Sequence, residues 1–209
     1  MSAASRPQGS HRQSLRSAPA VAIFLAVAGT AFAADLVSKH VVFEDLLADP
    51  ACRSRMEGLR SRPGAAPRDL LSAFRRDVAP GVRWTLSANP GVVFGLDVSR
   101  SVVNVVTVLA IALVIGMFAA SGARAWATHL ALAFILAGAA GNLYDRLFSV
   151  VQLPGEPEQA IRHHVRDFID LGQLHYPWVF NLADAWLVIG VGILMLLWVM
   201  HARGASRPG

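Results

Sequence analysis

The sequence predicts an all-α membrane protein, with four transmembrane helices and a small extracytoplasmic β-cradle. The prediction rests on the composition, on the length of the apolar runs, and on one short alternating stretch between them. Hydrophobic residues make up 54% of the 209 residues and charged residues 16%, whereas soluble domains carry about 25% charged residues. This composition indicates a membrane protein and excludes an ordinary soluble domain.

Four apolar runs are long enough, or nearly so, to cross roughly 30 Å of hydrocarbon as helices of ~20 residues. None of them has an acidic or basic residue in its middle. An even number of spans places both termini on the same side of the membrane. The expected spans are Ala18–Ala34, Ser101–Ala120, Trp126–Tyr144 and Trp178–Met200.

The distribution of charge predicts the orientation. The N-terminal tail (1–17), the link at Arg124 and the C-terminal tail (201–209) contain arginine but neither Asp nor Glu. Because short basic segments stay cytoplasmic, we expect both tails in the cytoplasm. The exterior loops would be about 41–100 and 146–177, joined to a membrane domain of residues 18–200. The basic excess then favours anionic lipid over nucleic acid.

The first span has an alternative interpretation. A basic tail, an apolar stretch and the Ala-Phe-Ala sequence at 31–33 are also typical of a cleavable signal peptide. Three further spans, and the charged pair Asp35 and Lys39 directly beyond the cleavage motif, favour a retained helix.

The sequence of the first exterior loop indicates a flexible part and a part with regular structure. The stretch from Arg53 to Arg83 is rich in Arg, Pro and Gly and indicates a flexible insertion. Val82–Leu86 alternates enough to predict a short strand. An Asn-Pro-Gly turn signal at 89–91 follows, and then the apolar residues 92–94. We expect a small sheet here that lies on the membrane.

Ionisable side chains gather at the ends of the spans, where a buried charge marks a functional site. Asp35 and Lys39 lie four residues apart and share a helix face, as do Asn142 and Arg146. Arg146 can hold a carboxylate through its planar fork. The alternatives are a lysine that extends to the interface beside an acid and a helix end anchored by Tyr144 and Arg146.

Asp184 is the deepest acid of the chain. It shares a helix face with Asn181 and is flanked by Ala183 and Ala185, whose small side chains permit close approach by another helix or a substrate backbone. The alternative is that Asp184 caps the N-terminus of the last helix, where the helix dipole favours a negative charge.

Asp167 and Asp170 are the candidate partners of Asp184. When two carboxylates share one site, one of them keeps a proton near neutral pH. The neutral acid can donate to a scissile carbonyl while the charged one takes a proton from water. This chemistry hydrolyses a peptide without a covalent intermediate.

Other catalytic classes find less support in the sequence. His163 and His164 are adjacent and therefore point apart, and no His-Glu-x-x-His motif occurs. No serine lies beside a plausible base within a span. We therefore expect no metal and no cofactor.

Five motifs, taken together, resemble those of the lipoprotein signal peptidase (signal peptidase II) family, in the order typical of that family. The resemblance covers about residues 18–200. The motifs are Asp35-Leu-Val-Ser-Lys39, Asn89-Pro-Gly-Val-Val-Phe-Gly95, Gly141-Asn-Leu-Tyr-Asp-Arg146, Val165-Arg-Asp-Phe168 and Phe180-Asn-Leu-Ala-Asp184.

The resemblance implies an aspartic protease of the bacterial inner membrane with its site near the outer face. Its substrates would be prolipoproteins that carry diacylglycerol on a cysteine, cut just before that cysteine. Asp167 and Asp184 would be the catalytic pair, and the cradle would correspond to Val82–Leu96. We expect prolipoproteins and membrane lipids as partners, no nucleic acid, and a monomeric chain. The supporting residues around the pair, the substrate backbone and the lipid head group would be Asp35, Lys39, Asn89, Gly91, Asn142, Arg146, Asn181 and Ala183.

The chain departs from the family pattern in two stretches, both longer than usual: the one between Lys39 and Asn89, and Val150–His163. These two long stretches leave open which exterior loop closes over the expected active site. Asp170 adds an acid near the pair, but Asp167 alone lies in the Val-x-Asp-Phe pattern.

The alternative function is that of a small polytopic transporter or proton relay, in which intramembrane charges mark an ion pathway. A transporter predicts acids near the midplane and broken helices. Here the acids gather near one face of the membrane.

Overall fold

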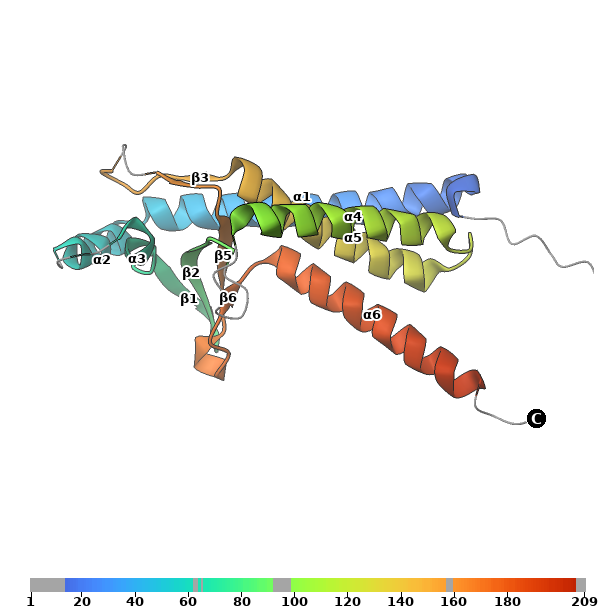
Figure 1. The fold of residues 1–209 in the computed structure, drawn as a ribbon. Coiled ribbons are helices and arrows are strands. Elements are labelled where there is room, and N and C mark those ends of the chain that lie inside the picture. The colour runs from blue at the N-terminus through green and yellow to red at the C-terminus, as the bar shows by residue number, and fades with distance from the viewer. Residues whose placement is uncertain (1–13, 62–63, 65, 92–98, 157–159, 206–209) are drawn as a thin grey trace, which may run out of the picture.

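The computed structural model describes residues 14–61, 64, 66–91, 99–156 and 160–205. Within these residues four helices are long and apolar enough to cross a membrane (Figure 1). The expected fold class, a helical membrane protein with a small sheet, is confirmed. The four helices are α1 (Ala18–Ala48), α4 (Arg100–Ala120), α5 (Trp126–Phe148) and α6 (Leu182–Ala205).

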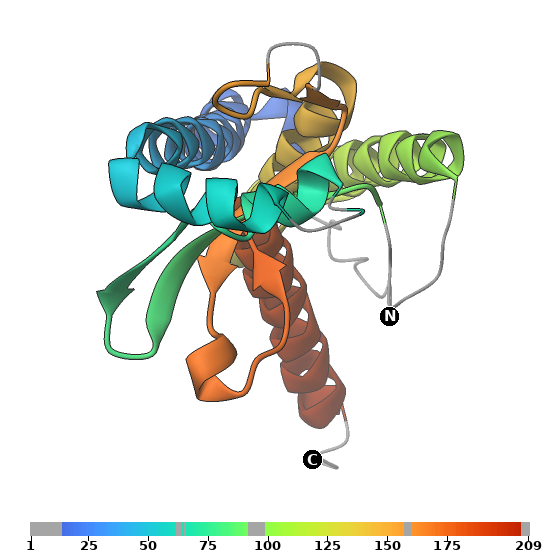
Figure 2. The same cartoon turned by 90° about the vertical axis from the view of Figure 1, so that its left-hand side faces the viewer.

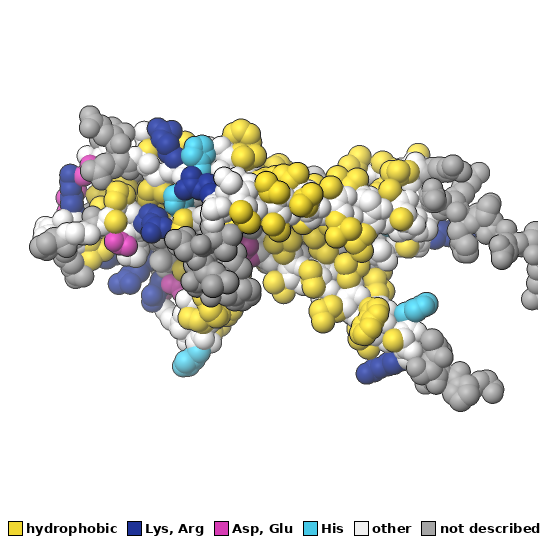
Figure 3. All heavy atoms as spheres, viewed as in Figure 1, with side chains coloured by type: hydrophobic (Ala, Val, Ile, Leu, Met, Phe, Trp, Pro, Cys, Tyr) yellow, Lys and Arg dark blue, Asp and Glu magenta, His cyan; other side chains and the backbone are white. Residues whose placement is uncertain are grey.

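Helix α5 is the centre of the bundle and packs against α1, α4 and α6. In α5, half of the residues in the most apolar 18-residue stretch are buried, compared with 11% in the corresponding stretches of α4 and α6. The outer helices instead present large exposed side chains such as Leu113, Val188 and Trp198. Figure 3 shows this apolar surface as a yellow band over the helices. Such a surface is stable only in lipid.

Helix α1 is longer than expected. Its 31 residues span roughly 46 Å at 1.5 Å per residue, so its outer end continues beyond the bilayer. Residues 41–48, expected in a loop, are helical. The charges of Asp35 and Lys39 do not end the helix because they pair with each other, and the helix stops only before Pro50.

The expected flexible insertion between Arg53 and Arg83 is instead structured wherever it is described. It contains most of α2 (Pro50–Arg60) and all of α3 (Pro67–Leu71) and β1 (Arg75–Ala79). Both helices begin with proline, which is favoured at the first helical position. The segment buries a second hydrophobic core outside the membrane, which includes Cys52, Met56, Leu71, Phe74 and Leu86.

The sheet has the strand order β1-β2-β5-β6, with every pair antiparallel. It adds β2 (Val82–Asn89), β5 (Val165–Asp170) and β6 (Val179–Phe180) to β1. The strand predicted at Val82–Leu86 is confirmed and is three residues longer. Residues 92–96 of the expected cradle lie outside the described residues, as do Arg6, Arg12 and Arg207 of the two tails.

The sheet lies at one end of the bundle, beside the outer part of α1 (Figure 2). A short hairpin, β3 (Val150–Val151) with β4 (Ile161–Arg162), follows α5, and the turn η2 (Gly172–Leu174) links β5 to β6. Figure 3 shows that most visible charged side chains gather at this end.

The opposite end of the bundle is closed by neutral polar groups. The turn η1 (Ser14–Arg16) precedes α1. The Ser14 hydroxyl lies 2.7 Å from the hydroxyl of Ser121 and 2.9 Å from Nε2 of His129. Ser14 and His129 are almost completely buried, so these bonds tie the start of α1 to the α4–α5 connection.

Candidate active site

Small residues bring α5 and α6 close together at the sheet end. A Cβ at Gly138 would clash with the carbonyl oxygen of Ala183, and one at Gly141 would lie 2.5 Å from Oδ2 of Asp35. Ala183 is fully buried. The close approach expected around Ala183 is therefore present, and it brings the polar side chains of α1, α5 and α6 into one cluster.

Asp184 and Asn181 form a reciprocal cap at the start of α6. The Asn181 backbone N–H donates to Oδ2 of Asp184 at 3.2 Å, and the Asp184 backbone N–H donates to Oδ1 of Asn181 at 3.1 Å. This is a capping box, so Asp184 does have the capping role considered as its alternative. Its Oδ1 also accepts a 2.8 Å bond from Nδ2 of Asn142, which fixes the carboxylate toward α5.

Asp167 lies on β5, opposite Ser87 of β2, and only 3% of it is exposed. Nδ2 of Asn181 donates to its Oδ1 at 2.5 Å, so one asparagine contacts both Asp167 and Asp184. Burial, and then the charge of Asp184, raise the pKa of Asp167 from 3.8 to about 8. At neutral pH Asp167 is therefore the protonated member of the pair.

Asn142 connects the pair to a buried lysine. Its Oδ1 accepts bonds from Nδ2 of Asn181 at 3.1 Å and from Nζ of Lys39 at 3.2 Å. Its Nδ2 donates a hydrogen bond to Asp184, so every polar atom of the Asn142 side chain has a partner. The side chain is thereby held in one orientation.

Lys39 lies between two carboxylates, and all three side chains are fully buried. Its Nζ is 2.7 Å from Oδ2 of Asp35 and 3.0 Å from Oδ2 of Asp145. The other oxygen of Asp35 accepts the backbone N–H of Ala183 at 2.9 Å. Asp35 therefore caps α6 as well as pairing with Lys39, a tertiary contact beyond the expected pair on one helix.

Asp145 is also bound by Arg166, the residue before Asp167. Nε and Nη2 of Arg166 both donate to Oδ1 of Asp145, at 2.9 and 2.7 Å, and the Arg166 backbone N–H donates to Oδ2 at 3.0 Å. The side chain and the backbone of Arg166 together connect β5 to α5 directly beside Asp167.

Arg146 is half-buried and makes no ion pair within the described part of the chain. Its Nε has no hydrogen-bond partner there, although its charge acts on Asp184, Asp167 and Asp145. Among the described residues, the charge of Arg146 therefore interacts with the pair without an ion pair, which makes this residue a candidate to bind a ligand.

Asn89 and Gly91 lie at the end of β2. Oδ1 of Asn89 accepts the backbone N–H of Gly91 at 2.9 Å, and the Asn89 side chain also donates to Asp167. Gly91 has a φ of 108°, which glycine adopts without strain. The chain beyond Gly91 lies outside the described residues until Ser99.

Asp170 is bonded away from the pair. Its carboxylate accepts from the hydroxyl of Thr85 and from the backbone N–H of Gly172, both at 2.8 Å. It closes the turn after β5 and makes no contact with Asp184 in the described structure.

Two participants were missed from the sequence. Asp145 and Arg166 each occur within a quoted motif, but neither was among the expected site residues. Since the partners lie on different elements, no spacing rule could have paired them. The one available signal was a charged residue next to Asp167 in a strand that is otherwise largely apolar.

Comparison with known proteins places this geometry in a family. A family model described as signal peptidase (SPase) II matches residues 27–200. The lipoprotein signal peptidase of Desulfitobacterium hafniense is 36% identical over 122 residues, which cover 57% of this chain and 70% of that protein. That of Mycobacterium tuberculosis is 39% identical over 120 residues, covering 56% of this chain and 52% of that protein.

Solved structures agree on the fold. A structure described as a bacterial membrane enzyme has a TM-score of 0.62 at 17% identity and covers 95% of this chain and 98% of its own. A second, described in the same words, has a TM-score of 0.61 at 19% identity and covers 90% and 96%. With the match to residues 27–200, the expected family and enzyme class are confirmed: the chain belongs to the signal peptidase II family of aspartic membrane peptidases.

Proposed function

We propose that this chain removes the signal peptide of prolipoproteins through Asp167 and Asp184. The observation that carries the proposal is the shared environment of the two acids: Asn181 contacts both. Asp167 is buried and protonated at neutral pH, whereas Asp184 sits at a helix N-terminus, where the dipole favours its charge.

The two acids would divide the chemistry between them. Asp184 takes a proton from a water molecule as the oxygen attacks the scissile carbonyl, and Asp167 gives its proton to the carbonyl oxygen. The resulting diol collapses when Asp184 returns its proton to the departing nitrogen and Asp167 recovers a proton from a hydroxyl. Asn142 and Asn181 hold the carboxylates in place, and Arg146, which has no ion pair among the described residues, is placed to bind the substrate.

We further propose that the cut lies just before a cysteine carrying diacylglycerol, and that the site faces the outside of an inner membrane with both termini in the cytoplasm. The exposed apolar faces of α4 and α6 support access for a lipidated substrate from the bilayer. The basic, acid-free tails support the orientation. A transporter is disfavoured because the acids gather at the sheet end of unbroken helices.

The test is cleavage of a purified prolipoprotein, with and without its diacylglycerol, by the protein in detergent. Mass spectrometry of the product should find one new N-terminus, at the lipidated cysteine, and little cleavage of the unlipidated form. The Asp184→Asn variant is the matched inactive control. A well-folded wild type that cuts neither form, or cuts elsewhere, contradicts the proposal.

A further inference from the structure

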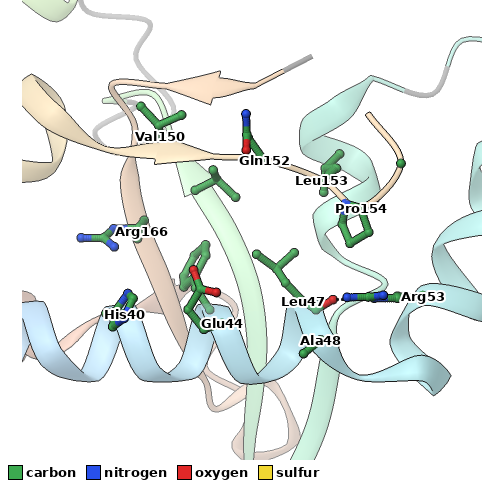
Figure 4. A pocket seen from close by; sticks show the side chains of 13 residues that line it. His40, Glu44, Leu47, Ala48, Arg53, Val150, Gln152, Leu153, Pro154 and Arg166 are labelled. Atoms are coloured by element: carbon green, nitrogen blue, oxygen red, sulfur yellow. Dashed lines mark hydrogen bonds between the residues drawn. The ribbon is translucent and has the colours of Figure 1, made fainter. Parts of the chain in front are cut away.

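A groove of about 640 Å³ lies between the outer end of α1 and residues 150–155 (Figure 4). Arg166 of β5 lines this groove. Because neighbouring side chains of a strand point to opposite faces of the sheet, Asp167 faces away from it. Further contacts with a substrate at the proposed pair are therefore expected on the other side of β5.

Helix α4 carries one polar side chain that the packing of the bundle does not explain. Between Val102 and Ala120 its sequence has two polar residues, Asn104 and Thr107. The Thr107 hydroxyl donates to the backbone carbonyl of Val103 at 2.8 Å, within the helix. In contrast, Oδ1 of Asn104 is buried and accepts no hydrogen bond from the described residues.

A buried carbonyl oxygen without a donor lowers the stability of a protein, and such atoms are rare in native structures. Within the hydrocarbon of a membrane no bulk water can take the place of the missing donor. An apolar side chain at position 104 would avoid this cost. The unsatisfied oxygen of Asn104 therefore points to a partner that is present only when a ligand is bound.

Asn104 lies on the side of α4 that faces the bundle. The buried and partly buried positions of this helix recur every three or four residues and so form one face. Val114 and Phe118 of this face pack against α1 and α5. The positions include Asn104, Thr107, Ile111, Val114 and Phe118.

Asn104 also lies at the depth of the proposed catalytic pair. Helices α4 and α5 pack side by side and run antiparallel (Figure 1), and the rings of Phe118 and His129 are 5.0 Å apart. Asn104 is fourteen residues before Phe118, which is about 21 Å along α4. The same distance along α5 leads from His129 to Leu143. Leu143 is the neighbour of Asn142, which donates to one acid of the pair.

The start of α4 adjoins the sheet that carries the other acid. Cγ2 of Val103 lies 3.7 Å from the position that a Cβ would occupy at Gly91. Asn89, two residues before Gly91, donates to Asp167 through its side chain. Asn104 follows Val103 directly, so it lies near both the sheet and the end of α5, the two elements that position the pair.

We propose that Oδ1 of Asn104 accepts a hydrogen bond from a backbone N–H of the substrate and so positions the peptide against Asp167 and Asp184. The inference rests on the proposed function. A carbonyl oxygen requires a donor, and a peptide backbone offers one at every residue except proline. The ester groups of diacylglycerol offer none, so the partner of this oxygen is the peptide and not the lipid.

The first test measures stability and cleavage together for Asn104→Leu, with a lipidated prolipoprotein in detergent. The change removes an unsatisfied polar atom, so the unfolding temperature should stay the same or rise. The value of kcat/KM should fall about fivefold, as expected for the loss of one hydrogen bond to the substrate. A lower unfolding temperature would assign Asn104 a structural role, and an unchanged kcat/KM would exclude contact with the substrate; either result overturns the inference.

Thr107→Val is the matched control for Asn104→Leu. Thr107 lies on the same face of α4, one turn deeper, and within the described residues its hydroxyl bonds only to its own helix. This variant should leave kcat/KM unchanged. A fivefold fall in Thr107→Val as well would mean that any polar loss on this face lowers activity, which contradicts a specific contact at Asn104.

The second test replaces single backbone amides of a lipidated peptide substrate by esters, at the residues on either side of the scissile bond but not at the bond itself. Each ester removes one N–H. At one position the ester should lower kcat/KM of the wild type about fivefold and leave Asn104→Leu unaffected, since its contact is already lost. Equal effects on both proteins at every position overturn the inference. If the wild type does not cut even the all-amide substrate, the proposed function itself fails.

Discussion

At the sheet end of the bundle the side chains of Asp35, Lys39 and Asp145 are fully buried and paired with one another, whereas at the opposite end the described residues form a hydrogen-bonded cluster of Ser14, Ser121 and His129. A buried ion pair loses so much hydration that it adds little stability. A neutral hydrogen bond contributes about 1 kcal/mol. The difference indicates that the ionic end is maintained for chemistry and the neutral end for closing the fold.

The largest effect should come from removing an acid of the pair. Asp167→Asn or Asp184→Asn should lower kcat by about 10²- to 10⁴-fold, because each removes a proton-transfer group. Circular dichroism should show an intact helical fold. Asp170→Asn is the matched control, since within the described residues Asp170 bonds to Thr85 and to the backbone of Gly172 rather than to the pair, and it should keep most of the activity. Equal loss in all three variants would contradict the assignment.

Breaking the ion cluster should affect the fold as well as the activity. Lys39→Met leaves Asp35 and Asp145 without their shared partner and should cost about 3–5 kcal/mol. Thermal unfolding in detergent measures this loss. The matched change at an exposed base, Arg162→Met, should be nearly neutral. A Lys39→Met protein as stable as wild type would show that the cluster is not charged as described.

The neutral end should show the smallest effect. Ser121→Ala removes contacts with Ser14 and His129 and should cost about 1 kcal/mol, seen as a small fall in the unfolding temperature. Cleavage at saturating substrate should be unchanged, because the cluster lies at the other end of the bundle. A marked loss of kcat would mean that the two ends are coupled.

Some features of the molecule could be predicted from the sequence, and others could not. The four spans followed from apolar length. Asp167 and Asp184 were expected as the catalytic pair from their motifs, and the structure places both in contact with Asn181. The regular structure in the insertion was not predicted because its prolines and glycines indicated a flexible loop, although Pro67 starts α3. Asp145 with Arg166, and Asp35 with Ala183, pair across elements, which only packing can establish.

The pH dependence of kcat/KM should reveal whether Asp167 holds the proton of the pair. Since the pKa of Asp167 is raised to about 8, this acid keeps its proton below pH 8 and loses it above. We expect kcat/KM to fall through this range, by about tenfold per pH unit above it. A rate that rises through pH 8, or stays flat well above it, would mean that Asp167 does not hold the proton of the pair.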